Sequence, residues 1–229
     1  MKALVLSSGG VDSSTALGLA VSKYGKENVI ALSVSYGQKH DKEIQSAIAV
    51  AEYYGVEQLF LDLSKIFRYS NCSLLQQSTE DIPEESYAEQ IAKTEGETPV
   101  STYVPFRNGL FLSSAASIAL SKGCEVIYYG AHADDSAGFA YPDCSPVFNN
   151  AMNEAIWEGS GHQLRIEAPF VNASKAEVVR MGLELGVPYE LTWSCYEGGE
   201  KPCGKCGTCI DRAEAFRLNN VEDPALKGE

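Results

Sequence analysis

The sequence is poor in basic side chains and has no long apolar run. Its 229 residues include 18 lysines and arginines against 31 aspartates and glutamates, a net charge of −13. Nucleic-acid-binding proteins draw most of their affinity from Lys and Arg at phosphates, so this balance argues against a polynucleotide partner. No apolar stretch approaches the roughly 20 residues that span a membrane, and the N-terminus lacks a signal-peptide pattern. We therefore expect a cytoplasmic protein with no membrane contact and no direct nucleic-acid contact.

Short apolar runs alternate with helical patterns along most of the chain. Continuous apolar runs suit parallel strands that are covered on both faces, and the β–α alternation predicts an α/β fold. We expect a Rossmann-like, doubly wound sheet of five parallel strands. The strands are expected at Ala3–Leu6, Val29–Val34, Gln58–Leu63, Glu125–Tyr129 and Leu164–Glu167, and the helices at Val11–Tyr24, Lys42–Tyr54, Asn108–Lys122, Pro146–Trp157 and Ser174–Leu185.

Composition also suggests how the chain is divided. Residues 1–190 read as one nucleotide-binding domain, interrupted at about 64–104 by a polar, acidic excursion with a short helix. Connections this long are uncommon in compact domains and are usually functional. The excursion is therefore a candidate lid or subunit contact, and we expect a homodimer. Residues 191–218 read as a C-terminal helical segment packed on the core, and residues 219–229 as a polar, frayed tail.

The stretch Ser7–Ser13, read Ser-Ser-Gly-Gly-Val-Asp-Ser, joins the first strand to the first helix. Its two glycines allow a sharp turn with positive φ, and the following helix N-terminus aims N–H groups at a bound anion. The loop lacks the lysine of a Walker motif and is not GxGxxG. The alternative is an ordinary turn in which a serine caps the helix. We favour a phosphate site made of Ser8, Gly9, Gly10, Val11, Asp12, Ser13, Ser14 and Thr15.

Four of the seven cysteines lie close together near the C-terminus. Cys195, Cys203, Cys206 and Cys209 have the spacing C-x7-C-x2-C-x2-C, which suits tetrahedral zinc in a closed, structural site. An iron–sulfur cluster is the competing interpretation. Of the other candidates for chemistry, Cys144 could act as a nucleophile and His132 as a general base, but we favour ordinary structural roles for both.

The motif at Ser8–Ser13 resembles the SGGxDS loop of the PP-loop ATPases, which adenylate an oxygen atom before a nucleophile displaces AMP. The order of several further motifs resembles one family of that superfamily, the QueC or 7-cyano-7-deazaguanine synthase family. These motifs are Tyr36–His40, Val104–Asn108, Tyr141–Cys144, Ser174–Glu177, Leu191–Tyr196 and the four cysteines. The resemblance runs nearly end to end and implies an adenine nucleotide α-hydrolase-like fold.

The resemblance also implies an activity. Members of this family are ATP-dependent ligases that convert 7-carboxy-7-deazaguanine and ammonia into 7-cyano-7-deazaguanine, the nitrile preQ0 of queuosine biosynthesis. We expect ATP and Mg²⁺ as cofactors, one structural Zn²⁺ per chain, and adenylation first of the carboxylate and then of the amide. The expected catalytic residues are Asp12, Lys175 and Arg107, and the expected substrate-binding residues are Arg107, Asn108, Asp135, Tyr141 and Asp143.

Two positions depart from the family pattern. Phe106 stands where the family usually has glycine, and Ser145 stands where many members have arginine. If that arginine meets an anionic group, another cation must replace it, and Arg107, Lys175 and Lys39 are the candidates. Two other functions stay open: a PP-loop sulfur transferase that acts on a tRNA base, and a non-catalytic zinc-ribbon interaction protein.

Overall fold

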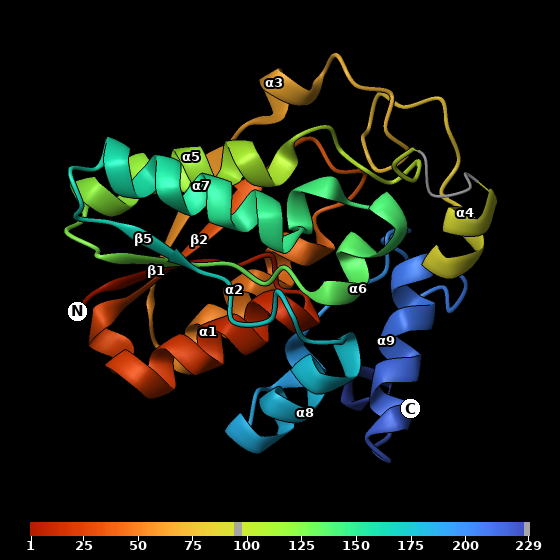
Figure 1. Cartoon of the computed structure of the whole chain (residues 1–229). Helices are drawn as coiled ribbons and strands as arrows, with labels where there is room; N and C mark the ends of the chain where they lie inside the picture. Colours follow the sequence, from red (N-terminus) through yellow and green to blue (C-terminus); the bar gives the residue numbers. More distant parts are fainter. Residues whose placement is uncertain (94–97, 227–229) are drawn as a thin grey trace.

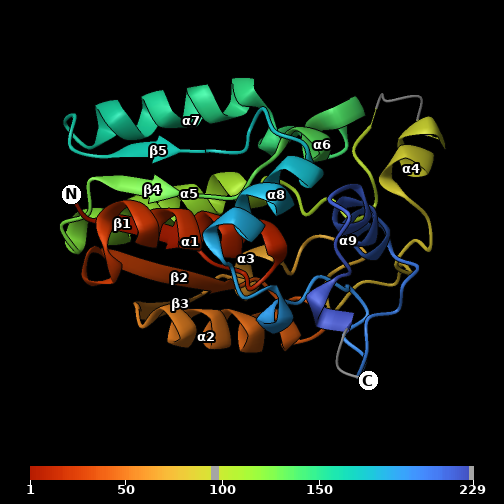
Figure 2. The same ribbon diagram turned by 90° about the horizontal axis from the view of Figure 1, so that it is seen from below.

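Five parallel strands form one sheet in the part of the chain that the computed structural model describes, residues 1–93 and 98–226. Figure 2 shows the strands side by side in the order β3-β2-β1-β4-β5. Their bounds are β1 Ala3–Leu6, β2 Val29–Ser35, β3 Glu57–Asp62, β4 Val126–Tyr128 and β5 Arg165–Glu167. The predicted fold class is confirmed, and the strand ends differ from those predicted by one residue at most.

Helices cover both faces of the sheet (Figure 1). The helices α5 (Arg107–Ser121) and α7 (Pro146–Gly159) pack on one face, where Leu4 points. The helices α1 (Val11–Tyr24), α2 (Lys42–Tyr54) and α8 (Lys175–Leu185) pack on the other, where Val5 points. Because successive side chains of a strand point to opposite faces, a strand buried between two helical layers must be apolar at every position.

Strand β1 lies where the strand order reverses. It pairs with β2 through Ala3↔Val29 and with β4 through Ala3↔Val126, both in parallel register. In open α/β sheets, ligands bind in the crevice outside the carboxyl ends of the strands at such a reversal. The loop from β1 to α1, where we expect the phosphate site, lies at this point.

The excursion at 64–104 holds two short helices rather than the one predicted, α3 (Ser64–Phe67) and α4 (Tyr87–Lys93); residues 94–97 lie outside the described part. Its apolar side chains, among them Phe67 and Leu75, pack with the cysteine-rich segment. Helix α4 lies beside α9 (Gly207–Leu218) in both views (Figures 1 and 2), and a Cβ at Gly207 would come within 2.9 Å of the Tyr87 ring. The excursion therefore covers the C-terminal segment.

The start of the tail is held to the fold, so the expectation that the whole tail is frayed is wrong; residues 227–229 lie outside the described part. Arg212 of α9 donates from Nε to one carboxylate oxygen of Asp223 at 2.6 Å and from Nη2 to the other at 2.9 Å. Both side chains are buried, and Arg212 also donates to Thr192 Oγ1 at 2.9 Å. This arginine joins α9, the tail and the loop that leads to the cysteines.

We expect Asp223→Ala to destabilise the fold by roughly 3–5 kcal/mol, because it leaves a buried guanidinium without its carboxylate. The loss is measured as a lower urea midpoint. The control is Asp81→Ala, which removes an exposed carboxylate and is expected to cost less than about 0.5 kcal/mol. A cost for Asp223→Ala no larger than that of the control would show that the pair is not structural.

Candidate active site

A cleft opens at the carboxyl ends of β1, β2 and β4. Its walls come from the β1–α1 loop, the loops after β2 and β4, the first turn of α5, and the C-terminal segment. Among the lining side chains are Ser8, Asp12, Ser13, Tyr36, Glu43, Arg107, Asn108, His132, Asp135, Tyr141, Lys175, Trp193, Tyr196 and Asp211. The structure therefore brings together predicted residues that are up to 167 positions apart, since Ser8 and Lys175 share this cleft.

The β1–α1 loop presents an uncapped helix N-terminus to the cleft. Gly10 is the N-cap of α1, and among the described residues no side chain caps the N-terminus of this helix. The alternative of a serine-capped turn is therefore wrong. The first N–H groups of a helix have no intrahelical partner, so the start of α1 can donate hydrogen bonds to an anion in the cleft. The hydroxyl of Ser13 lies 3.0 Å from that of Ser8 and accepts the Ser8 N–H at 3.1 Å, which fixes the shape of the loop.

The two glycines of the loop have different tasks. Gly9 has a φ of +79°, and a Cβ there would come within 2.4 Å of the Ala47 backbone nitrogen, so close packing on α2 requires this glycine. Gly10 has an extended backbone with a φ of −80° and lines the cleft. The expected positive φ therefore holds at Gly9 alone. Trp193 also donates its N–H to the Gly9 carbonyl at 3.0 Å, which ties the C-terminal segment to the loop.

Three predicted members of the phosphate site do not line the cleft. Gly9 faces α2, and Ser14 is fully buried inside α1. The Thr15 hydroxyl donates to the Val11 carbonyl and lies 2.8 Å from the hydroxyl of Tyr189, a residue just before the C-terminal segment. These residues support the loop from behind.

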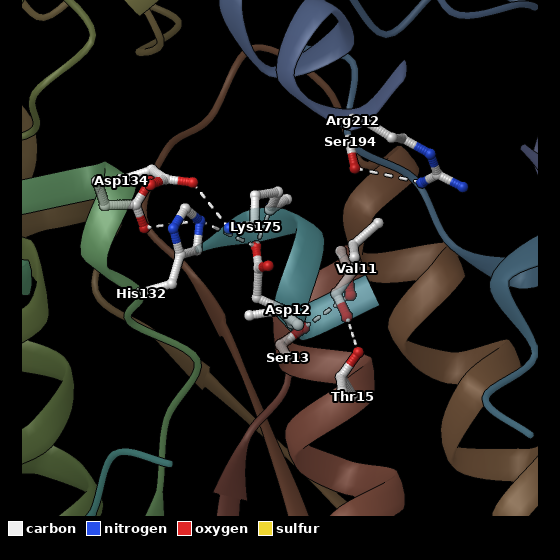
Figure 3. Close-up of polar contacts among 12 residues, drawn as sticks. Val11, Asp12, Ser13, Thr15, His132, Asp134, Lys175, Ser194 and Arg212 are labelled. Carbon is white, nitrogen blue, oxygen red and sulfur yellow. Dashed lines mark hydrogen bonds and ion pairs between the residues drawn. The ribbon is translucent and has the colours of Figure 1, made fainter. Parts of the chain in front are cut away.

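Asp12 is the centre of a charged group in the cleft (Figure 3). Its Oδ2 atom accepts a hydrogen bond from Lys175 Nζ and lies 3.8 Å from His132 Nε2. Burial acts to raise the pKa of Asp12, but the charges of Lys175 and His132 outweigh it and hold the pKa below its usual range. Oδ1 is buried and has no hydrogen-bond partner among the described residues. Asp12 therefore keeps one carboxylate oxygen unpaired inside this charged group.

Two further carboxylates line the same part of the cleft. Asp135 lies 3.3 Å from His132 Nε2, and burial raises its pKa although His132 and Lys175 oppose the shift. Asp211 comes from α9, and burial raises its pKa to about 6. Asp211 was not predicted from the sequence. Its position two residues after Cys209, a predicted metal ligand, could have indicated that it lies near the site. The C-terminal segment therefore contributes a carboxylate to the site.

Arg107 lies in a second, aromatic part of the cleft. Its guanidinium stacks 5.1 Å from the centre of the Tyr36 ring, which in turn lies 5.9 Å from the Phe111 ring. Tyr196 also lines this part of the cleft, and its hydroxyl forms a hydrogen bond of 2.6 Å with the hydroxyl of Tyr87. The motifs at Tyr36–His40 and Leu191–Tyr196 indicated that these two loops belong to the site. They did not indicate that the aromatic side chains of the loops form one wall of the cleft.

The other predicted substrate-binding residues divide into two groups. Asn108 and Tyr141 line the cleft, whereas Asp143 does not. Asp143 accepts the Asn108 backbone N–H at 2.9 Å and so holds the first turn of α5 in place. Tyr141 is buried, and its hydroxyl pairs with that of Thr102 at 2.5 Å.

The two departures from the family pattern have local explanations. Phe106 has a φ of 55°, a left-handed conformation that glycine adopts without strain, and its ring packs against Phe148 at 5.8 Å. Ser145 is the N-cap of α7, where its hydroxyl accepts the Phe148 N–H at 3.1 Å. Of the three cations that could replace the missing arginine, Arg107 and Lys175 line the cleft and Lys39 does not.

Cys144 lines the cleft as a buried thiol. Burial, together with Asp135 and Asp143, raises its pKa well above the usual range, and Asn108 Nδ2 lies 3.2 Å from the sulfur. A nucleophilic cysteine needs the thiolate at neutral pH. The environment of Cys144 opposes that form.

We expect Cys144→Ala to change the rate of a reaction in this cleft by no more than roughly threefold, because burial opposes the thiolate that a nucleophilic cysteine needs. Steady-state turnover and intact mass after treatment with a thiol reagent measure the two parts of this expectation. A loss of about 10³-fold with normal folding would restore the cysteine as a nucleophile.

The four cysteines of the C-terminal segment meet at one point. Their sulfur atoms all lie within 4.8 Å of one another, compared with about 3.8 Å between sulfurs around tetrahedral zinc. The Cys203 N–H donates to Cys195 Sγ at 3.3 Å, and the Cys206 N–H donates to Cys203 Sγ at 3.4 Å. Such donors stabilise thiolates, so the donor set fits a thiolate-binding metal ion.

Comparison with known proteins identifies the family. Residues 2–220 match the family described as "Queuosine biosynthesis protein QueC". The chain is 44% identical to the 7-cyano-7-deazaguanine synthase of Archaeoglobus fulgidus, in an alignment that covers 100% of this chain and 91% of that protein. It is 45% identical to the 7-cyano-7-deazaguanine synthase of Thermoplasma acidophilum, in an alignment that covers 97% of this chain and 90% of that protein.

Solved structures agree at the level of the fold. An NMN synthetase from Francisella tularensis matches with a TM-score of 0.53 at 17% identity, over 96% of this chain and 78% of that one. The U34-tRNA thiolase NcsA from Methanococcus maripaludis, with its [4Fe-4S] cluster, matches with a TM-score of 0.50 at 15% identity, over 96% and 64%. The family match covers nearly the whole sequence and agrees with the motifs and the sheet: the chain belongs to the QueC family of queuosine biosynthesis proteins.

Proposed function

We propose that this protein is an ATP-dependent ligase that converts 7-carboxy-7-deazaguanine and ammonia into 7-cyano-7-deazaguanine. The observation that carries the proposal is the cleft itself. An uncapped helix N-terminus, a paired lysine and aspartate, and an aromatic wall with an arginine share one cavity at the strand-order reversal. Such a cavity suits two ligands, a nucleoside triphosphate and a flat heteroaromatic acid.

The first part of the reaction joins the substrate carboxylate to AMP. A carboxylate oxygen attacks the α-phosphorus of ATP, pyrophosphate leaves, and ammonia then displaces AMP to form an amide. The first-turn N–H groups of α1, with Ser8 and Ser13, hold the leaving pyrophosphate. Lys175, fixed by Asp12, neutralises charge that develops at the α-phosphate, because catalysis of such transfers rests on positioning and electrostatics.

The second part removes the amide oxygen. The amide oxygen attacks the α-phosphorus of a second ATP and pyrophosphate leaves. Loss of AMP and of both amide N–H protons then leaves the nitrile. The same phosphate-binding groups serve both steps. Asp135 lies in the charged group around Asp12, where its carboxylate would accept a proton when ammonia attacks and when the nitrile forms.

Two metal ions belong to the proposal. The buried, unpartnered Oδ1 of Asp12 suits Mg²⁺, which takes oxygen ligands and neutralises phosphate charge. The four cysteines would hold one structural Zn²⁺, because four thiolates leave no open position. Metal analysis that finds zinc without the visible absorption of an iron–sulfur cluster supports this choice, and iron with sulfide overturns it.

Further proposals concern the surroundings of the enzyme. We propose a cytoplasmic homodimer in which residues 64–104 contribute to the subunit contact, and sedimentation analysis tests the assembly. All seven cysteines are free in the structure, which suits a reducing compartment. No helix of the described residues is long and apolar enough to cross a membrane.

The test of the function is the product. Purified protein with ATP, Mg²⁺, ammonium and 7-carboxy-7-deazaguanine is expected to yield the nitrile by mass spectrometry. Absence of both the nitrile and the amide, in protein that is folded and loaded with metal, would refute the proposal. A gel shift with tRNA at moderate salt tests the sulfur-transferase alternative, which the charge of −13 disfavours.

A further inference from the structure

A carboxylate and a guanidinium line the aromatic part of the cleft without pairing with each other. Glu43 lies in the first turn of α2, and Arg107 begins α5. In the described part of the chain neither takes part in any ion pair, whereas Lys175 and Arg212 are paired. The Glu43 carboxylate also accepts no hydrogen bond from a described residue, and both side chains remain open to the cleft.

This arrangement is costly unless a ligand uses it. Burial raises the pKa of Glu43, while the charges of Arg107 and His40 act against the shift. Partly desolvated charges normally pair with one another, because that recovers part of the lost hydration energy. Two opposite charges that face one cavity and stay apart therefore indicate a ligand with a donor edge and an acceptor edge.

The walls between them define the shape of that ligand. Tyr36 lies under the guanidinium, and Phe111, Trp193 and Tyr196 complete an aromatic surface along the cleft. Aromatic rings and a stacked arginine favour a flat heteroaromatic group. The ligand at this position is therefore a planar ring system that presents a carbonyl acceptor next to N–H donors.

We infer that Glu43 is the specificity-determining residue that accepts hydrogen bonds from the ring N1–H and the exocyclic 2-amino group of the substrate, while Arg107 donates to its ring carbonyl. This inference rests on the proposed function, whose substrate carries these groups on adjacent ring atoms. Adenine presents the opposite order, an amino group beside an unprotonated ring nitrogen, so the same pair of charges disfavours adenine at this position. Sites built around such donors reject analogues that lack them, because a buried acceptor is then left unpaired.

The test compares two substrates in one variant. With Glu43→Gln, we expect kcat/KM for 7-carboxy-7-deazaguanine to fall on the order of 10²-fold, because the amide presents an NH2 group to the donor edge of the substrate. The analogue without the 2-amino group keeps N1–H as its one donor at this edge, so it should be a poor substrate of the parent enzyme and should lose less in the variant than the full substrate does. KM for ATP should stay the same. Glu43→Asp, which keeps the charge, should recover part of the discrimination.

Two controls separate the possible failures. Glu52→Gln changes an exposed glutamate of the same helix and should leave all these constants unchanged. Equilibrium binding of each substrate by calorimetry gives the same comparison without turnover. Equal losses for both substrates in Glu43→Gln and Glu43→Asp, or a rise in KM for ATP, would overturn the assignment of Glu43. A parent enzyme that neither binds 7-carboxy-7-deazaguanine nor makes nitrile would instead overturn the proposed function.

Discussion

Asp12→Ala is expected to lower kcat/KM on the order of 10³-fold or more, the scale found when a preorganised charge at a transition state is removed. The substitution releases Lys175 Nζ from its partner in the described part of the chain and removes the buried oxygen that we propose as a ligand of Mg²⁺. Both effects act on the phosphate that is being transferred. Nitrile formation under steady-state conditions measures the loss, and pyrophosphate release reports whether adenylation itself has stopped.

Three comparisons make the Asp12 prediction specific. The variant should retain its bound metal and its urea midpoint within about 1 kcal/mol, because the Asp12 side chain remains partly exposed to the cleft. Asp81→Ala is the matched surface control. The double variant with Lys175→Ala should be little worse than either single variant, because the two side chains act as one unit. Full activity of Asp12→Ala would remove the loop from the mechanism.

Cys206→Ser is expected to lose most of the bound metal and to release the C-terminal segment from the core. Structural zinc contributes roughly 10 kcal/mol or more of binding free energy that is coupled to folding. The segment also supplies Trp193, Tyr196 and Asp211 to the cleft, so activity should fall together with the metal content. Metal analysis, turnover and limited proteolysis of the segment measure the three effects.

The control for this prediction is Cys124→Ala, which removes a buried cysteine outside the cluster. It should keep the metal and most of the activity, at a stability cost of about 1 kcal/mol. A chelator should reproduce the effect of Cys206→Ser in the parent protein, and added zinc should reverse it. A metal-free protein with normal turnover and normal protease resistance would contradict a structural role for the site.

The sheet was predictable because local patterns determine it. The central strands β1, β2 and β4 are short, mostly apolar runs, and the α1 and α2 bounds were predicted without error. The excursion was harder to predict. Its apolar residues are scattered, and α4 depends on contacts with α9, more than a hundred residues away, which a local pattern cannot contain.

The site was predictable where a motif carries it. Asp12 and Lys175 stand in recognisable motifs, and the fold brings the two side chains into contact, a pairing that the motifs alone did not predict. Asp143 stands in such a motif too, but its carboxylate faces the backbone of Asn108, a choice that only packing decides. Glu43 and Asp211 were missed because each is one acidic residue on a helix, a pattern that is usually a solvated surface.

The central claim is that each of two ATP molecules adenylates an oxygen of the substrate, and oxygen isotopes test it most directly. With both carboxylate oxygens of 7-carboxy-7-deazaguanine labelled with ¹⁸O, the account predicts unlabelled nitrile and two molecules of AMP, each carrying one labelled oxygen. Mass spectrometry of the nucleotides and of inorganic phosphate measures the distribution. Label in inorganic phosphate together with ADP, or label released into water, would contradict the account.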